Sequence, residues 1–226
     1  MPVLEKIPVA LPAGEVVTHL RLAGHGGEDL ARELLAEAAP LIQARAFYRE
    51  VFIEEKGEDW VRLEGAVFKS RVLRANLERA EKFFPYVLTV GGGLEERAAH
   101  AGDLLRQYYL ETIADLSLMS AGVYLERHLH TRFGFEKLSS MNPGSLEDWP
   151  ITEQKPLFAL LGDPEAAIGV RLNKSLLMLP RKSVSGVLFP TEESFYSCQL
   201  CARERCQGRR ASFDEALRRK YENVNS

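Results

Sequence analysis

Three cysteines lie close together near the C-terminal end of the sequence, at Cys198, Cys201 and Cys206. Two thiolates separated by two residues can bind one metal ion or the edge of an iron–sulfur cluster, and a third thiolate five positions on can close a turn around it. The arginines around them would lower the pKa values of the thiols. An odd number of cysteines argues against a disulfide framework. The trio therefore predicts a site for an iron–sulfur cluster or zinc. Because a fourth ligand is missing, a tail with reduced, idle cysteines is an equal alternative.

A run of three glycines, Gly91 to Gly93, follows a predicted strand at 86–90 and precedes a predicted helix. Backbone N–H groups at such a turn can approach a phosphate or a nucleoside. A dinucleotide-binding fingerprint, however, needs a further glycine where this sequence has Glu96, and the carboxylates of Glu95 and Glu96 would repel a pyrophosphate. We therefore favour a tight structural turn, and a Rossmann-type methyltransferase is the weakest of the enzyme hypotheses.

The histidines and serines form no recognisable catalytic arrangement. His128 and His130 are two residues apart, so on a helix their side chains point to nearly opposite sides and cannot share a metal ion. No Ser/His/Asp or Cys/His combination follows from local spacing. We expect no catalytic residue in this chain.

The composition restricts the class of protein. The chain has 226 residues, of which 46% are hydrophobic and 27% charged, and its formal net charge is −3. That apolar content is too high for a disordered chain. No apolar run approaches the ~20 residues of a membrane-spanning helix, and charged residues and prolines stand where a secretory signal would be apolar. We therefore expect a cytoplasmic protein with no membrane contact and, because basic residues are not in excess, no nucleic-acid partner.

Helical and strand periodicities alternate along the chain, which predicts an α/β or α+β fold. The predicted helices are 28–43, 70–83 with Ser70 as cap, one or two between 95 and 132 ending at Gly134, and 152–161 capped by Thr152. The predicted strands are 46–53 and 60–63 as a hairpin, then 86–90, 168–172, 176–179 and 183–189, with a loop at 141–150. We divide the chain into a single globular domain, 1–197, and an extension rich in cysteine and arginine, 198–226.

Four short motifs follow one another in the second half of the chain. They are Ser139-Ser140-Met141-Asn142-Pro143-Gly144-Ser145, Trp149-Pro150-Ile151-Thr152-Glu153-Gln154-Lys155, Gly169-x-x-Leu172-x-x-Ser175 and Pro180-x-x-Ser183-Val184-Ser185-Gly186. Alone, each predicts a loop, a short helix or a hairpin. Together and in this order they resemble the activation domain of cobalamin-dependent methionine synthase, a family that binds S-adenosylmethionine (AdoMet). The resemblance covers Ser70 to about Phe189. It implies one domain with a twisted mixed or antiparallel sheet flanked by long helices.

The resemblance also implies a ligand site. Asn142, Pro143 and Gly144 match the family's AdoMet-binding loop, and Tyr196 falls near a tyrosine that contacts the ligand. Two positions depart from the family: Ser140 stands in the place of an arginine, and Ser145 in the place of a tyrosine. A guanidinium can bind a carboxylate through two hydrogen bonds and a serine cannot, so the loss at position 140 costs about 2 kcal/mol of ligand affinity.

The same resemblance implies partners. Glu126 matches a helix that lies near the corrinoid in the family, which makes it a candidate for partner contact. The sequence has no Asp-x-His-x-x-Gly motif for cobalamin and no Cys-x-x-x-Cys-x-x-Cys motif of radical AdoMet enzymes. Cobalamin is therefore expected only through a partner, with the electron from a separate donor protein.

These features predict an accessory module that binds AdoMet. The module would serve the reductive methylation, and so the reactivation, of a corrinoid-dependent methyltransferase such as methionine synthase. Its role would then be in methionine biosynthesis. The module would have no acid, base or nucleophile of its own. The alternative is an electron-transfer or scaffold protein that has lost AdoMet binding and uses a metal or cluster at the three cysteines.

Overall fold

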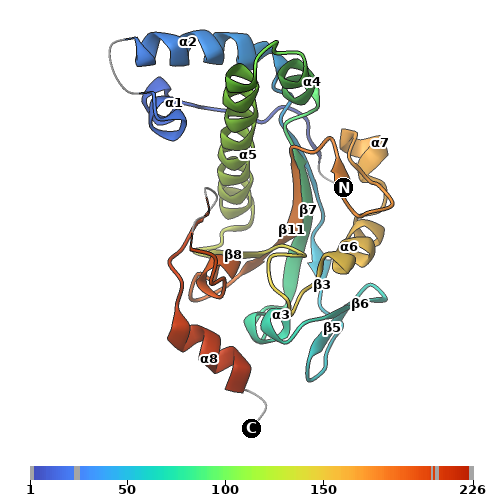
Figure 1. Ribbon diagram of the computed structural model, residues 1–226. Coiled ribbons are helices and arrows are strands. Elements are labelled where there is room, and N and C mark those ends of the chain that lie inside the picture. Colours follow the sequence, from blue (N-terminus) through green and yellow to red (C-terminus); the bar gives the residue numbers. More distant parts are fainter. Residues whose placement is uncertain (1–2, 23–25, 205, 207–208, 224–226) are drawn as a thin grey trace.

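The computed structural model describes residues 3–22, 26–204, 206 and 209–223, which form an antiparallel sheet covered by helices on both faces (Figure 1). The strand order is β1 (Val3–Leu4), β2 (Arg45–Tyr48), β7 (Lys82–Thr89), β11 (Ser183–Pro190) and β8 (Leu138–Met141), and β3 (Val51–Phe52) also pairs with β7. Every pairing in this sheet is antiparallel. The mixed α and β fold and the antiparallel sheet predicted from the sequence are therefore confirmed.

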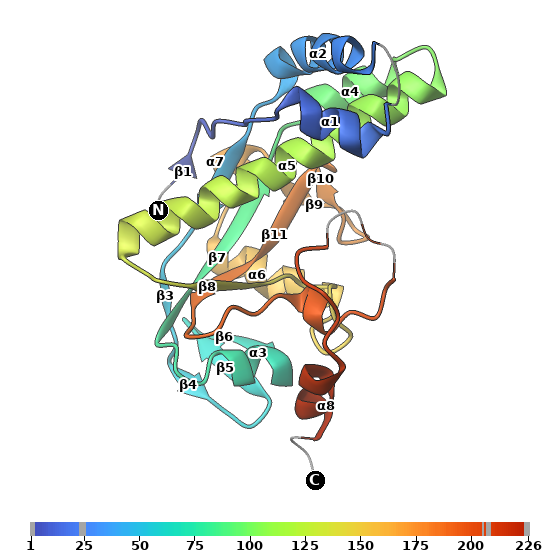
Figure 2. The same ribbon diagram turned by 90° about the vertical axis from the view of Figure 1, so that its left-hand side faces the viewer.

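The two long central strands separate two hydrophobic clusters, because successive side chains of a strand point to opposite faces. Leu88 of β7 and Leu188 of β11 pack against α5 (Leu104–Phe133), and we call this side of the sheet the α5 face. Val87 and Val187 point to the other side, where they pack with α6 (Gln154–Leu161). In Figure 2, α5 runs diagonally across the sheet.

The charged and apolar stretch between 95 and 132 forms two helices. α4 (Gly93–Ala99) ends at His100, and α5 begins after Asp103, whose side chain accepts a hydrogen bond of 2.8 Å from the Arg106 backbone. Gly134 ends α5 with a φ of 70°, as predicted, since this left-handed conformation strains residues with a side chain.

The N-terminal helices form a third cluster beside the sheet. α1 (Ala13–Leu20) and α2 (Gly27–Ala38) pack on α4 and on the N-terminal half of α5, and a 3₁₀ turn (Ala39–Leu41) follows α2. Figure 1 shows this group at the end of the sheet opposite the C-terminal helix. The helix predicted over 28–43 is thus shorter than expected, since Pro40 lies in the 3₁₀ turn.

A small sheet of three strands lies at the other end of the molecule. It consists of β4 (Glu55–Lys56), β5 (Trp60–Leu63) and β6 (Ala66–Lys69), followed by α3 (Arg71–Asn76). Ser70 caps α3 as predicted, and its hydroxyl accepts a hydrogen bond of 2.9 Å from the Leu73 backbone. The helix predicted to Phe83 ends early because Lys82 already begins β7, where pairing with three strands outweighs the helical period.

The face of the sheet opposite α5 is covered by short elements. They are a 3₁₀ turn (Ile151–Glu153), α6, α7 (Pro164–Ile168), β9 (Arg171–Leu172) and β10 (Met178–Leu179). The predicted cap at Thr152 is wrong, because Thr152 lies inside the 3₁₀ turn. The strand predicted from Ile168 begins at Arg171, because Asp163 caps α7 through the Ala166 backbone.

The C-terminal extension packs onto the domain. A 3₁₀ turn (Ser197–Gln199) is followed by irregular chain and by α8 (Glu215–Asn223). Leu217 and Tyr221 of α8 pack against the core, and the Tyr221 ring lies 5.9 Å from the ring of buried Phe195. A boundary between 197 and 198 stays a prediction. Within the described ranges, no helix combines the length and apolar character needed to cross a membrane.

Candidate functional site

The motif Asn142-Pro143-Gly144-Ser145 forms a tight turn immediately after edge strand β8. The Ser145 backbone donates a hydrogen bond of 3.1 Å to the Asn142 carbonyl, with Pro143 in the second position and Gly144, at a φ of 84°, in the third. This is the pattern of a type II turn, whose third position favours glycine. The Gly144 backbone also donates to the carbonyl of fully buried Trp149 at 2.8 Å, which fixes the turn on the core.

The side chain of Asn142 anchors the turn to the sheet. Its Nδ2 donates hydrogen bonds to Tyr86 Oη at 3.0 Å and to the Ser185 carbonyl at 2.8 Å. Gly186, the last residue of the hairpin motif, leaves the space for this side chain. Burial raises the pKa of Tyr86 to about 12, so its phenol stays protonated and neutral at physiological pH.

Tyr196 lies beside the strand that leads into the turn. Ser140 pairs with Tyr196 in a parallel bridge. The backbone N–H of Ser140 donates a hydrogen bond of 3.3 Å to the Phe195 carbonyl. The Phe195 backbone donates in turn to Ser139 Oγ at 2.7 Å. The segment around Tyr196 therefore covers the free edge of β8, and it places this tyrosine next to the start of the turn.

Arg210 connects Tyr196 with Glu126 of α5. The guanidinium donates to Glu126 Oε1 at 2.6 Å and to Oε2 at 2.8 Å, and its central carbon lies 4.5 Å from the centre of the Tyr196 ring. Burial opposes the charge of Arg210, but the Glu126 carboxylate outweighs it and raises the pKa of the guanidinium. Arg210 and Glu126 also act electrostatically on buried Tyr86, the hydrogen-bond acceptor of Asn142.

The structure thus brings together, through Arg210 and Tyr86, three predicted site residues from distant parts of the chain: Asn142, Tyr196 and Glu126. Sequence reasoning did not find either linking residue. Tyr86 stands in the strand predicted at 86–90, and Arg210 is one of the arginines around the cysteines, without a role of its own in the prediction. Only the alternation of β7, which turns Tyr86 and Leu88 to the same face, could have indicated Tyr86.

The cysteines do not form a recognisable metal centre. All three are free, Cys198 and Cys201 partly buried and Cys206 exposed. Among the described residues, no group of three or more His, Cys, Asp or Glu side chains could hold a metal ion. The hypothesis of an iron–sulfur or zinc site therefore gains no support from the structure.

The loop that carries the cysteines is organised instead by Arg209. Its guanidinium donates to the carbonyls of Cys198 at 3.1 Å, Cys201 at 3.2 Å and Ala211 at 3.2 Å, and also to that of Arg203. The next residue, Arg210, contacts Cys198 Sγ through its backbone N at 3.4 Å. The cysteine loop therefore holds the two arginines in place through its main chain.

A hollow of about 660 Å³ lies beside the turn, between the segment 145–148 and the tail at 200–202. Ser145 and Cys201 line it, and Arg218 and Tyr221 of α8 close one side. Asn142, Pro143, Gly144 and Tyr196 are not among its lining residues. The tail thus borders the turn twice, through Tyr196 and Arg210 on the α5 face and through this hollow.

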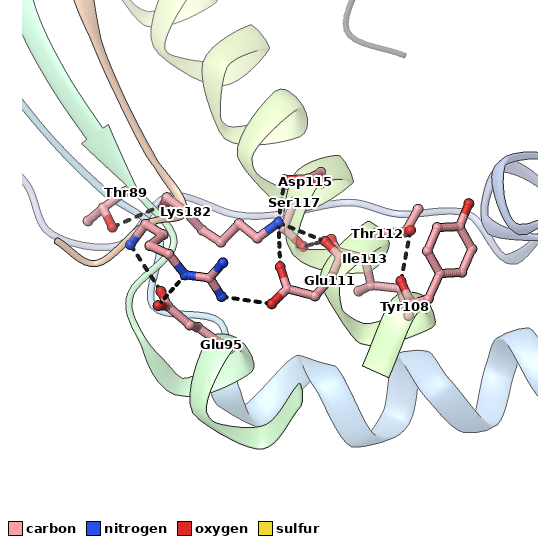
Figure 3. Close-up of polar contacts among 10 residues, drawn as sticks. Thr89, Glu95, Tyr108, Glu111, Thr112, Ile113, Asp115, Ser117 and Lys182 are labelled. Atoms are coloured by element: carbon pink, nitrogen blue, oxygen red, sulfur yellow. Dashed lines mark hydrogen bonds and ion pairs between the residues drawn. The ribbon is translucent and has the colours of Figure 1, made fainter. Parts of the chain in front are cut away.

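A network of ion pairs lies close to the glycine turn at 91–93. Lys182 Nζ lies 2.7 Å from both Glu111 Oε2 and Asp115 Oδ1, and Arg181 pairs with Glu95 at 2.6 Å and Glu111 at 2.9 Å (Figure 3).

Packing accounts for the last glycine of this turn. A Cβ at Gly93 would lie 2.8 Å from the Leu41 carbonyl oxygen. Glu95 forms an ion pair with Arg181, and Gly93 packs against Leu41. The turn at 91–93 is therefore a structural turn.

Comparisons with known proteins agree with these observations. Residues 145–211 match the model of the family described as Vitamin B12 dependent methionine synthase, activation domain. That segment contains Tyr196, the three cysteines and Arg210. No curated protein matches the chain.

A solved structure shares the fold. The crystal structure of the MetH reactivation domain bound to AdoHcy matches with a TM-score of 0.60 and 17% sequence identity, over 81% of this chain and 67% of that chain. The family match covers the segment that contains Tyr196 and Arg210, and the solved structure shares the fold over most of the chain. These comparisons support the activation-domain family of vitamin B12 dependent methionine synthase.

Proposed function

We propose that this chain binds AdoMet at the Asn142–Ser145 turn and presents it to a corrinoid-binding methyltransferase for reductive methylation. The observation that carries the proposal is the convergence of the turn, Tyr196 and Glu126 on one face of the sheet. Segments distant in sequence thereby bring a few polar groups together, as the polar groups of ligand sites converge.

The turn offers hydrogen-bond acceptors to a ligand. Within the described parts of the chain, no N–H group donates to the carbonyls of Pro143 and Gly144. Gly144 is exposed, so its carbonyl can be reached from outside, whereas Pro143 is buried. The exocyclic amino group of an adenine is a donor that suits such a carbonyl. The Gly144 carbonyl therefore fits the nucleoside part of AdoMet.

The aromatic groups suit the positive end of the ligand. The Arg210 guanidinium lies 4.5 Å from the centre of the Tyr196 ring, so this ring already stacks against one cation. Tyr86 is buried and stays neutral below its pKa of about 12, so it adds no charge beneath the turn. We assign Tyr196 a role in binding and Tyr86 a role in positioning the turn through Asn142.

The proposed chemistry needs position rather than acid–base groups. The corrinoid of the partner supplies the nucleophilic cobalt, and a separate donor protein supplies the electron. This chain's part is to hold the methyl sulfonium in line and to exclude other orientations, since orientation alone can lower a barrier by about 7–11 kcal/mol. The turn is fixed to the core through Trp149 and to the sheet through Asn142, which gives it the required rigidity.

The similar crystal structure supports the choice of ligand. That protein is described as bound to AdoHcy, the product that AdoMet becomes when it loses its methyl group. Its fold is shared over most of this chain, and the family match begins at Ser145, within the turn. Both point to the same ligand class for the present chain.

Isothermal titration with AdoMet tests the proposal. We expect saturable binding that is lost in Tyr196→Ala and kept in the control Phe52→Ala, an exposed aromatic on the far strand β3. A second titration in the presence of a corrinoid-binding methionine synthase fragment should show tighter binding. No heat at millimolar AdoMet in either titration would exclude the function.

A further inference from the structure

The pair Arg210–Glu126 lies on the α5 face, beside the tyrosine that pairs with the strand leading into the turn. Leu138 of β8 packs on the α5 face and Met141 packs on the other, so the alternation turns Ser140 toward α5. Ser140 is small, and its strand neighbour Tyr196 lies under the Arg210 guanidinium. The pair therefore stands over the start of the turn.

The chain next to Arg210 also holds it in place. The neighbouring Arg209 guanidinium binds the carbonyls of Cys198, Cys201 and Ala211 and fixes the backbone from which Arg210 projects. The Arg210 side chain itself is 39% exposed, and that of Glu126 is 21% exposed. The Arg209 guanidinium thus has a structural role, and the Arg210 guanidinium is partly exposed at a defined position.

The pair has unused hydrogen-bonding capacity. Its two hydrogen bonds use two of the five N–H donors of a guanidinium. In the ranges that the structure describes, no other acceptor lies within hydrogen-bond distance of the Arg210 side chain. Each carboxylate oxygen of Glu126 can accept a second hydrogen bond. Cation and anion can therefore each bind a further polar group.

We propose that Arg210 and Glu126 recognise the zwitterionic amino-acid end of the ligand, with Arg210 binding the α-carboxylate and Glu126 the α-ammonium group. This inference rests on the proposed AdoMet function and states which part of the ligand the pair binds. The Arg210–Glu126 pair and the amino-acid end of the ligand each carry one positive and one negative charge. Each charge can therefore pair with an opposite one, and no ion is left unpaired. A partly buried ion left alone would be costly.

The geometry favours this over a purely structural ion pair. The planar fork of an arginine suits a carboxylate, and the Tyr196 ring below it keeps the fork in one plane. The bridge between Ser140 and Tyr196 connects the strand that leads into the turn with the tyrosine under Arg210.

The experiment compares three ligands by isothermal titration: AdoMet, AdoHcy and 5′-methylthioadenosine, which keeps the nucleoside thioether and lacks the amino-acid end. The proteins are the full chain, Arg210→Gln, Arg210→Lys and the control Arg79→Gln. Arg79 also forms an ion pair, with Glu192, but both side chains are more than three-quarters exposed and the pair is remote from the turn. Thermal unfolding verifies that each variant is folded, and Arg210→Lys keeps the charge if Arg210→Gln does not fold.

We expect the unchanged chain to bind AdoMet and AdoHcy at least about tenfold more tightly than 5′-methylthioadenosine. Arg210→Gln should remove that preference while its affinity for 5′-methylthioadenosine stays the same, Arg210→Lys should lose part of it, and Arg79→Gln none. A preference that survives in Arg210→Gln, or an equal loss for all three ligands, would overturn this inference and leave AdoMet binding intact. Absence of binding of all three ligands to the unchanged chain would overturn the proposed function and this inference with it.

Discussion

The side chain of Asn142 lies directly against the backbone of Gly186. A Cβ at position 186 would overlap Asn142 Nδ2 and lie 2.6 Å from the Met141 carbonyl oxygen. The amide crosses β11 at this glycine to reach Tyr86 and the Ser185 carbonyl. Two motifs that are far apart in the sequence, the turn and the hairpin, therefore depend on one close contact.

Gly186→Ala should destabilise the protein by about 1–3 kcal/mol, because the added methyl group displaces Asn142 and leaves buried polar groups without partners. Urea unfolding followed by circular dichroism measures the change. The matched control is Gly14→Ala in α1, where nothing lies within 4 Å of the added Cβ and the helix should gain up to about 1 kcal/mol. Equal effects of the two substitutions would contradict the role given to Gly186.

Gly144→Ala should reduce AdoMet affinity beyond its effect on stability. The φ of 84° strains any residue with a Cβ, and the added atom would also lie 2.9 Å from Ile151 Cδ1. Gly65→Ala is the control, since its φ of 78° carries similar strain, of about 1–2 kcal/mol, in a turn between β5 and β6 with open space around it. We expect both variants to lose stability in thermal unfolding and only Gly144→Ala to lose binding in titration. Loss of binding in both would point to a general effect of instability.

Lys182→Met should destabilise the protein by about 2 kcal/mol, because it leaves the partly buried Glu111 without its main partner. Burial opposes ionisation of Glu111, but the hydrogen bonds from Lys182 and Arg181 outweigh it and lower the pKa of Glu111. The folded state then resists protonation of this carboxylate, so its stabilising contribution is present above pH 4.5 and is lost as the pH falls further.

The control for this pair is Lys69→Met, because Lys69 pairs with Asp59 at 3.4 Å with a side chain that is 76% exposed. An exposed pair contributes about 1 kcal/mol or less. Urea unfolding at pH 7 and at pH 3 compares the two variants. A Lys182→Met protein as stable as Lys69→Met at pH 7 would show that the network in Figure 3 contributes little.

His128 should make the protein less stable in mild acid. Its Nε2 lies 2.9 Å from Tyr48 Oη, and burial, with a smaller contribution from Arg132, lowers its pKa below 6.5. Since the unfolded chain takes up the proton first, stability is complete above pH 6.5 and falls as the pH drops through that value. His128→Gln should show a shallower loss of melting temperature between pH 7 and pH 5 than the unchanged chain, and an equal loss in both proteins would contradict this role of His128.

The sequence was a good guide where a local rule decides the structure. The glycine after α5 and the serine before α3 follow from capping preferences, and the structure has both. Helical period between 95 and 132 left one or two helices open, and the structure has two. The turn at Asn142 could be located from Pro143 and Gly144, because a type II turn needs both.

Long-range pairing decided the parts that could not be predicted. Lys82 and Phe83 look helical in isolation, but they lie in β7, at the centre of the sheet. The edge strand β8, rich in serine, carries no strand pattern of its own and is defined by β11 and by the Tyr196 segment. Arg210 reaches Glu126 across 84 residues, and nothing in the tail sequence indicates that contact.

The most direct test of the central claim is an amide NMR titration of the labelled chain with AdoMet. The account predicts that the largest shifts occur at Gly144, Ser145 and Tyr196, with Glu126 and Arg210 next. Shifts confined to Gly91–Gly93, or no shifts at saturating ligand, would contradict it.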